Sequence, residues 1–370
     1  MAEERPMAEG ASPKPGQPRH RRRRRGEAWF DAELSAAIAF FDTPDDLLDI
    51  EAQRESFRRN YEGARPLSMT GVEVLDIPGG TSEGPPVRVR IYRPVHAPEG
   101  ALPAMLWLHG GAFSFAFAEI DDDICSRLAL DAGYVLVSPD YRLSPEHPFP
   151  AGIDDAYRTL EWMAAQATRM GLDPGCIVVG GSSSGGALAA AICLRARDEH
   201  GPTIQLQVLS CPVTDDRMDS PSMRTYDDTP VFDQVQAAAM WDRYLGTDRP
   251  PDVSPFAAPA RARSLADLPP AYVVTAHHDP LRDEALRYAM RLIAAGNRTE
   301  LHHFPDTFHS FDLVVPTSGL SLRVYSDYLA ILRRVRADAA PSAPVEAGRG
   351  AEGTDVPEYG PTTSARSRTA

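Results

Sequence analysis

The chain of 370 residues is long enough for one large α/β domain or for two domains of ordinary size. Its apolar fraction of 43% is typical of a globular protein and excludes a chain that is disordered throughout. The formal net charge of −14 argues against nucleic acid as a partner, because binding to phosphates requires a basic surface.

The first residues of the chain, 1–26, are predicted to be a disordered basic leader. They are rich in Pro, Gly, Arg and Glu, show no periodicity, and include five consecutive arginines at 21–25. Such a block of like charges usually stays solvated, and contact with acidic lipid or polymer is the alternative. Because no long apolar segment follows it or occurs later, we expect neither a signal peptide nor a membrane anchor. We expect a cytoplasmic protein without stable membrane insertion.

The region between residues 27 and 336 begins with two runs in which apolar and polar residues alternate. These runs are 72–77 and 87–92, and in the second Val87, Val89 and Ile91 alternate with arginines. Alternation of this kind is typical of a half-exposed antiparallel strand at the edge of a sheet.

The later apolar runs are mostly continuous, as expected of strands that are covered on both faces. They are 104–108, 134–137, 177–179, 206–209, 272–276 and 299–304. Segments with helical periodicity accompany them, notably 151–167, 186–198, 281–295 and 320–336. This order predicts an α/β fold in which a mostly parallel central sheet is flanked by helices.

Two helical segments lie outside this alternation. Residues 28–65 precede every strand, and residues 212–250, which include the helical stretch 231–245, are inserted between two strands. A helical cap over one end of the sheet is the simplest placement for both segments. Residues 337–370 are rich in Ala, Gly, Pro, Ser and Thr and are predicted to be a disordered tail.

The strongest motif is Gly181-Ser182-Ser183-Ser184-Gly185, which lies between an apolar run and a helical segment of small residues. Ser183 alone has one glycine two positions before it and another two positions after it. A nucleophilic serine needs such neighbours, because it lies on a tight turn from strand to helix that crowds Cβ atoms. We therefore predict Ser183 as the nucleophile. An ordinary Gly- and Ser-rich loop is the alternative, and a phosphate-binding loop is disfavoured because no Gly-Lys-Ser/Thr follows.

A second glycine turn, with the sequence His109-Gly110-Gly111-Ala112-Phe113, follows the run 104–108. Acyl transfer places negative charge on a carbonyl oxygen, and backbone N–H groups in such a turn can approach that oxygen closely. We predict that Gly110, Gly111 and Ala112 form an oxyanion hole together with Ser184. The donors would be the N–H groups of Gly111, Ala112 and Ser184, and a plain turn at the end of a strand is the alternative.

Asp279 and His309 follow two later runs and are predicted to complete a triad in the chain order Ser, Asp, His. Asp279 lies at the carboxyl end of its strand, where active sites gather in such sheets. His309 lies in a loop from which it can accept the proton of Ser183, while Asp279 orients its imidazole ring. Asp283 and Glu284 are interpreted as acids in the first turn of the next helix, where the helix dipole favours them.

Other candidate ligands and catalytic groups fit the pattern less well. His277 and His278 precede Asp279, and His302 and His303 belong to a predicted strand. Adjacent side chains on a strand point in different directions, so these histidines make a poor metal site. Cysteines occur singly, without a CxxC pair, and are interpreted as buried free thiols: Cys125, Cys176, Cys193 and Cys211. We expect neither a metal ion nor a cofactor.

Four segments together resemble the bacterial hormone-sensitive-lipase-like esterases of the α/β-hydrolase superfamily. His109–Phe113 resembles the His-Gly-Gly signature of that family, and Gly181–Gly186 resembles its Gly-Asp-Ser-Ala-Gly-Gly motif. Asp140–Ala151 and Asp279–Glu284 are similar to two further family segments, and the first is expected to support the loop beneath the site. The resemblance covers roughly residues 30–336 and implies the α/β-hydrolase fold with an N-terminal helical cap.

The sequence departs from the family pattern at four positions near the predicted site. Ala112 stands where a third glycine is usual, and Ser182 and Ser184 flank the nucleophile in place of Asp and Ala. Ser310 follows the predicted base in place of Gly. An oxyanion donor is a backbone group and tolerates a side chain, so we expect these departures to affect substrate preference more than activity.

The resemblance implies a serine carboxylesterase that hydrolyses esters with short to medium acyl chains through an acyl-enzyme intermediate. One alternative is a deacetylase or amidase acting on a small natural product. Another is a non-catalytic binder of small molecules, similar to the plant gibberellin receptors, which have lost the histidine that this chain has at position 309. The expected partner is a small-molecule ester, and the sequence leaves a homodimer open.

Overall fold

The fold is known from a computed structural model, which describes residues 30–38, 48–63, 69–79, 84–97 and 99–339. The predicted leader, 1–26, lies outside the described residues. The predicted tail, 337–370, does so too except for its first three residues, which complete a long helix, α11 (Gly319–Ala339). The disorder expected of both segments therefore stays a prediction.

The centre of the fold is an eight-stranded sheet with the strand order β1-β2-β4-β3-β5-β6-β7-β8. β2 pairs antiparallel with β1 and β4, and the remaining neighbours are parallel. Every predicted run corresponds to one strand, which confirms the antiparallel start and the mostly parallel body. The strands are β1 (Val72–Gly79), β2 (Val87–Pro94), β3 (Leu102–Leu108), β4 (Val135–Pro139), β5 (Leu172–Ser182), β6 (Leu206–Ser210), β7 (Ala271–His278) and β8 (Thr299–Phe308).

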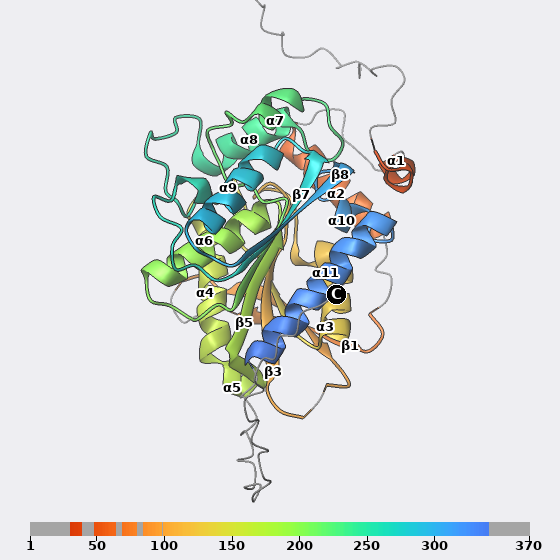
Figure 1. Ribbon diagram of the computed structural model, residues 1–370, viewed down its shortest axis with the longest axis vertical. Coiled ribbons are helices and arrows are strands. Elements are labelled where there is room, and N and C mark those ends of the chain that lie inside the picture. The colour runs from red at the N-terminus through yellow and green to blue at the C-terminus, as the bar shows by residue number, and fades with distance from the viewer. Residues whose placement is uncertain (1–29, 39–47, 64–68, 80–83, 98, 340–370) are drawn as a thin grey trace, which may run out of the picture. The chain divides into compact units, whose positions relative to one another are not determined.

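Helices cover both faces of the sheet (Figure 1). One face carries α4 (Ala151–Ala165), α5 (Ala167–Met170), α6 (Ser184–Asp198) and α9 (Arg282–Ala294). The other face carries α3 (Asp122–Ala132), α10 (Phe311–Val314) and α11. Short 3₁₀ turns lie at η1 (Ala118–Asp121) and η2 (Pro259–Arg261). The four helices named from periodicity are confirmed, whereas α3 was not among them.

The alternation of side chains along β3 explains why its sequence is apolar throughout. Leu106 and Leu108 are buried against the layer that contains α4 and α6, and Met105 and Trp107 are buried in the layer that contains α3 and α11. A strand between two helical layers has no face for polar residues. At the edge of the sheet, β2 instead buries Val87, Val89 and Ile91 and leaves the arginines between them partly exposed.

The segments outside the alternation form separate helices. In the range 28–65 the described residues include α1 (Ala32–Ile38) and α2 (Ile50–Gly63), while 39–47 lie outside the described residues. In the range 212–250 they include α7 (Pro221–Thr225) and α8 (Gln234–Leu245). The end of α8 lies near the start of α2: Arg243 Nη2 of α8 donates to the carbonyl of Leu48, two residues before α2, at 2.7 Å. α1 instead contacts the start of α11, where the N–H of Gly319 donates to Glu33 Oε2 of α1 at 2.7 Å.

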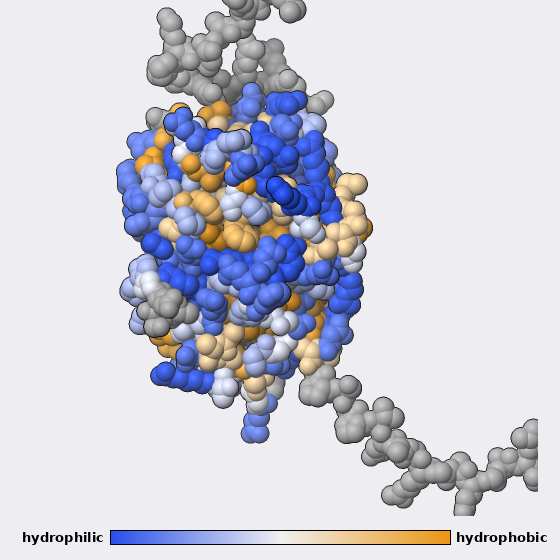
Figure 2. Space-filling view, turned by 90° about the vertical axis from the view of Figure 1, so that its left-hand side faces the viewer, coloured by the Kyte–Doolittle hydropathy of each residue, from blue (hydrophilic) through white to orange (hydrophobic). Residues whose placement is uncertain are grey.

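The surface is largely hydrophilic, with apolar atoms in separate patches on the face that Figure 2 shows. Large apolar side chains that stay exposed in the described part of the chain are scattered over several elements: Leu48, Leu75, Val95, Leu130, Met290, Ile293 and Leu322. Single exposed apolar residues of this kind are usual in globular proteins. None of the helices in the described ranges combines the length and the apolar character that a membrane span needs.

The buried carboxyl group of Asp121, in the layer that contains α3 and α11, leads to a testable prediction for stability. Trp107 Nε1 donates to Asp121 Oδ2 at 2.8 Å, and burial raises the pKa of Asp121 to about 7 from its ordinary value of 3.8. The folded state therefore holds a proton that the unfolded chain releases, and stability is lost as the pH rises through this window. Asp121→Asn cannot ionise and keeps an acceptor for Trp107. We expect it to gain stability relative to the wild type by roughly 1 kcal/mol per pH unit between about pH 4 and 7.

Urea denaturation of both proteins at pH 5 and at pH 8 measures this difference. Asp248→Asn, at an exposed position, is the control and should follow the wild type at both pH values. An Asp121→Asn variant whose free energy of unfolding differs from the wild type by the same amount at pH 5 and pH 8 contradicts the prediction.

Candidate active site

Ser183 lies alone between a strand and a helix, because β5 ends at Ser182 and α6 begins at Ser184. Its backbone has φ 56° and ψ −120°, a conformation that costs free energy for any residue with a Cβ atom. Ser210 holds this turn, since its carbonyl accepts a hydrogen bond of 2.8 Å from the N–H of Ser183. The predicted turn from strand to helix is therefore present.

The two glycines of the motif are required by the approach of β3. A Cβ atom on Gly181 would lie 2.5 Å from the carbonyl oxygen of Leu108, and one on Gly185 would lie 1.9 Å from the same oxygen. Both distances are far shorter than any real contact of a Cβ atom. The glycines thus allow the end of β3 to touch the turn that carries Ser183.

The three predicted triad residues meet at the edge of the sheet formed by the carboxyl ends of its parallel strands. His309 Nε2 lies 2.9 Å from Ser183 Oγ, and His309 Nδ1 lies 2.8 Å from Asp279 Oδ2. All three side chains are buried. Because the carboxylate accepts the proton of Nδ1, Nε2 is left as the acceptor for the hydroxyl of Ser183. The other oxygen of Asp279 accepts from the N–H of Leu281 at 2.8 Å, which fixes the carboxylate.

The remaining histidines and acids named from the sequence are engaged elsewhere. His277 Nδ1 lies 3.3 Å from His303 Nε2, and His302 Nδ1 lies 3.4 Å from a carboxylate oxygen of Asp327. Asp283 and Glu284 are in the first turn of α9, as predicted. Asp283 accepts from the N–H of Ser222, and Glu284 accepts from the N–H groups of Thr214 and Asp215. Both acids therefore hold the backbone of the segment 212–250.

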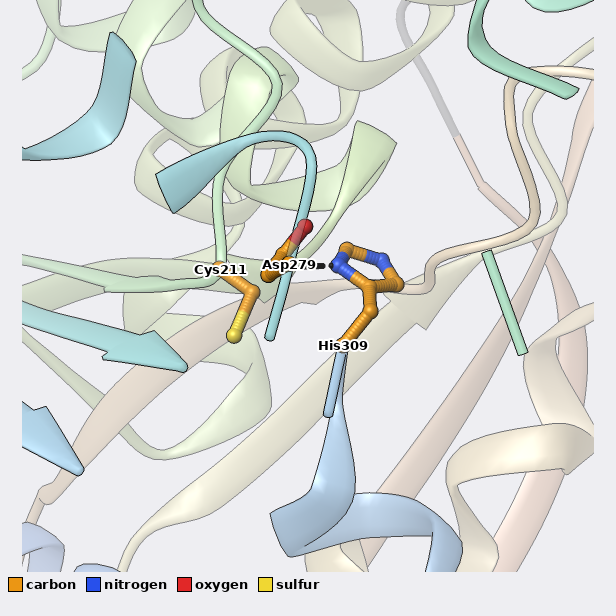
Figure 3. A group of neighbouring side chains, drawn as sticks. All are labelled: Cys211, Asp279 and His309. Atoms are coloured by element: carbon orange, nitrogen blue, oxygen red, sulfur yellow. Dashed lines mark hydrogen bonds and ion pairs between the residues drawn. The ribbon is translucent and has the colours of Figure 1, made fainter. Parts of the chain in front are cut away.

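Cys211 lies directly beside Asp279 and His309 (Figure 3). Potential ligand atoms of the three residues lie within 4.8 Å of one another, and this is the one cluster of that kind among the described residues. Both ring nitrogens of His309 already contact Ser183 and Asp279, and burial raises the pKa of the Cys211 thiol well above its ordinary value. A protonated, buried thiol is a poor metal ligand. The cluster is therefore better suited to proton transfer than to holding a metal ion, and all four cysteines are free and buried.

The predicted oxyanion turn lies against the serine turn. A Cβ atom on Gly110 would lie 3.5 Å from the Cβ of Ser183, and the carbonyl of Gly111 accepts from the N–H groups of Ser114 and Phe115. Gly111 has φ 103° and Ala112 has φ 51°, so Ala112 adopts a backbone conformation that glycine adopts more easily. Ser184 is the first residue of α6, where N–H groups have no partner within the helix.

The segment 140–151 supports this turn from below, as the sequence predicted. Tyr141 Oη donates to the carbonyl of His109 at 2.7 Å, and the two rings stack with their centroids 4.2 Å apart. Burial lowers the pKa of His109, which keeps its ring neutral against the tyrosine. The N–H of Ser144 donates to the carbonyl of Phe113 at 2.8 Å. The turn is therefore held at both of its ends.

Sequence reasoning missed a ring that lies over the histidine. Phe232 comes from the inserted segment 212–250, and its centroid lies 5.0 Å from that of His309. Ser182 and Ser310 were named from the sequence as departures near the predicted site, but the contact of their hydroxyl groups, which lie 3.1 Å apart, was not predicted. Neither contact has a local signal, because the partners are separated by tens of residues in the chain and belong to different elements.

Comparisons with known proteins identify the family of the chain. The family model for the alpha/beta hydrolase fold matches residues 105–313. Esterase LipI of Mycobacterium tuberculosis is 42% identical over 64% of this chain and 73% of its own. The chain belongs to the hormone-sensitive-lipase-like family of α/β hydrolases. Ethyl acetate hydrolase of Pseudomonas putida is 32% identical over 70% of this chain and 83% of its own.

Solved structures of the family show the same fold. The structure of a bacterial heroin esterase matches with a TM-score of 0.79 and 38% identity, over 83% of this chain and 98% of that protein. The named relatives are esterases or carboxylic ester hydrolases, so the predicted enzyme class, a serine carboxylesterase, is confirmed at the level of the family.

The contact of the serine turn with β3 predicts that two glycines respond differently to the same substitution. Gly185→Ala places a Cβ atom 1.9 Å from a backbone oxygen, which cannot move away without disrupting the sheet. Gly110→Ala meets its nearest atom, the carbonyl oxygen of Ser182, at 3.3 Å. We expect Gly185→Ala to lose about 3 kcal/mol or more of stability, and Gly110→Ala to remain folded with reduced activity.

Thermal unfolding followed by circular dichroism, together with ester hydrolysis, separates the two variants. A Gly185→Ala protein that melts with the wild type would mean that the turn does not touch β3 as described.

Proposed function

We propose that this esterase hydrolyses small carboxylic esters at Ser183, with His309 as general base and Asp279 as the residue that orients it. The observation that carries the proposal is the continuous chain of contacts from Asp279 to His309 to Ser183, of 2.8 and 2.9 Å. A serine hydroxyl is a weak nucleophile at neutral pH, and an adjacent neutral imidazole activates it by accepting its proton. This chemistry requires neither a metal ion nor a cofactor, which stays a prediction.

The reaction would proceed through an acyl-enzyme. As Ser183 Oγ attacks the ester carbonyl, its proton passes to His309 Nε2, and the carboxylate of Asp279 stabilises the resulting imidazolium. The N–H groups of Gly111, Ala112 and Ser184, with Gly110 in the same turn, would donate to the oxyanion. His309 then gives its proton to the leaving alcohol, and a water molecule repeats the steps to release the acid.

A helical cap over this edge of the sheet is part of the proposal. Phe232 from the inserted segment contacts the ring of His309, and Phe57 of α2 contacts Phe115, just after the oxyanion turn, with ring centroids 4.7 Å apart. Arg54 of α2 adds two hydrogen bonds to the carboxylate of Glu146 and one to the carbonyl of Ser114. The domain would then span 27–336, with cap helices from the ranges 28–65 and 212–250. Such a cap favours short to medium acyl chains.

A second candidate function is removal of an acetyl group from a small natural product. The similarity to an ethyl acetate hydrolase favours acetyl esters in particular. Hydrolysis of amides has no comparable support among the named relatives. A purely binding role is disfavoured, because a binder needs no buried base in contact with a serine hydroxyl. Location in the cytoplasm and assembly into a homodimer stay predictions.

The triad makes a direct prediction for activity. We expect Ser183→Ala to lower kcat for p-nitrophenyl butyrate by about a millionfold, because the nucleophile is lost. Asp279→Asn should lower it by about ten-thousandfold, because the wrong tautomer of His309 results. The measurement is steady-state hydrolysis followed by the release of p-nitrophenol. Retention of activity by Ser183→Ala, or the lack of turnover of any short ester by the wild type, overturns the proposal.

Two matched controls test the choice of residues. Asp306→Asn removes an exposed acid three positions before His309, and His303→Gln removes an exposed histidine on β8. The aspartate control carries the same chemical change as Asp279→Asn, and both controls lie outside the chain of contacts. Each should keep kcat within about twofold of the wild type.

The cap predicts a preference for acyl length that depends on Phe232. The wild type should hydrolyse p-nitrophenyl acetate and butyrate faster than the octanoate and palmitate, because the covering ring limits the space above His309. Phe232→Ala opens that space, so the optimum should move toward longer chains. Phe256→Ala, a partly buried aromatic on another loop, is the control. An identical chain-length profile for Phe232→Ala and the wild type contradicts this assignment of the cap.

A further inference from the structure

Two serines flank the proposed triad residues and contact each other. Ser182 precedes Ser183 and ends β5, and Ser310 follows His309. Their hydroxyl oxygens lie 3.1 Å apart, and both side chains are buried. A single hydrogen bond thus joins the turn that carries the nucleophile to the loop that carries the base, although the two serines are 128 positions apart in the sequence.

The backbone conformation of Ser310 indicates that its side chain makes a stabilising contact. Ser310 has φ 54° and ψ 31°, the left-handed conformation that glycine adopts without strain. A residue with a Cβ atom is destabilised at this position unless its side chain makes a compensating contact. The hydrogen bond to Ser182 is such a contact.

A second link holds the same segment two residues further along the chain, at Asp312. The carbonyl of Ser210 accepts from the N–H of Ser183 at 2.8 Å, and Ser210 Oγ donates to Asp312 Oδ2 at 3.1 Å. Tyr328 Oη of α11 donates to the same oxygen at 3.1 Å. The start of α10 is therefore fixed to the end of β6 through Asp312, and the carbonyl of Ser310 accepts from the N–H groups of Leu313 and Val314 at 3.1 and 3.0 Å. The hydrogen bond from Ser182 joins this same start of α10 to the serine turn, directly after His309.

We propose that Ser182 and Ser310 are positioning residues, whose hydrogen bond holds the imidazole of His309 at the hydroxyl of Ser183. This inference rests on the proposed roles of Ser183 and His309. Neither serine accepts a proton from the substrate or donates one to it. Both serines act through the distance between His309 Nε2 and Ser183 Oγ, which governs proton transfer in each half of the reaction. Catalysis is steeply sensitive to such distances, and a displacement of about 1 Å can cost about a hundredfold in rate.

A double-mutant cycle tests the pair. The variants are Ser182→Ala, Ser310→Ala and the double variant, and the readouts are kcat and KM for p-nitrophenyl butyrate and the rate at which a phosphonate ester labels Ser183. We expect each single variant to lower kcat and the labelling rate about five- to tenfold with KM unchanged. The double variant should be no slower than the slower single variant, because the bond is lost only once.

Two further variants separate positioning from stability. Ser310→Gly removes the hydroxyl and also relieves the backbone strain, so it should melt no lower than Ser310→Ala and still be slow. Ser318→Ala removes a hydroxyl from another buried serine pair, Ser318 and Ser321, whose oxygens lie 2.8 Å apart at the start of α11. It should lower the melting temperature and leave kcat and the labelling rate unchanged.

The results distinguish this inference from the proposed function on which it rests. The positioning role is overturned if the effects of Ser182→Ala and Ser310→Ala multiply in the double variant, or if the single variants keep the wild-type kcat. Either outcome counts even while Ser183→Ala is inactive. Full activity of Ser183→Ala would instead overturn the proposed function itself.

Discussion

The contact between the end of β3 and the serine turn is the constraint on which the rest of the site depends. The carbonyl oxygen of Leu108 occupies space that a Cβ atom on residue 185 would fill, at 1.9 Å. That approach brings the turn 109–113, which continues β3, beside Ser183. The proposed donors to the oxyanion and the proposed nucleophile therefore have their relative positions set by backbone packing within the sheet, before any side chain is considered.

The remaining parts of the site are added to this centre by neighbouring strands. β7 delivers Asp279 and β8 delivers His309, because parallel strands end at the same edge of the sheet. The loops at that edge are then fixed by polar contacts: Tyr141 holds the carbonyl of His109, and Ser210 holds Asp312. A rigid sheet thus supplies the coarse positions, and hydrogen bonds between loops supply the fine ones.

Much of this arrangement was predictable from sequence because its determinants are local. The glycines at 181 and 185 single out Ser183, and the alternating and apolar runs locate every strand. The expectation that 299–304 is covered on both faces was wrong, because β8 is an edge strand and its residues up to His303 are partly buried or exposed. α3 was missed because η1 and acidic residues obscure its start, although seven of its side chains are buried. The contacts of Phe232 with His309 and of Ser182 with Ser310 were beyond reach, because they depend on how separate loops pack in space.

Part of the backbone strain in the described chain lies at the proposed site, although residues elsewhere, such as His200, Met218 and Asp267, also have positive φ. Ala112, Phe113, Ser183 and Ser310 all have φ between 51° and 56°, and each is a residue with a Cβ atom. Such conformations cost of order 1 kcal/mol or more apiece and persist only where the surroundings determine them. Here the surroundings are the sheet edge and the hydrogen bonds of the loops, so stability contributed by the core holds the site in one geometry. The proposed triad is already assembled without substrate, so it would need little rearrangement when substrate binds. A fixed set of dipoles and proton carriers lowers a reaction barrier in this way.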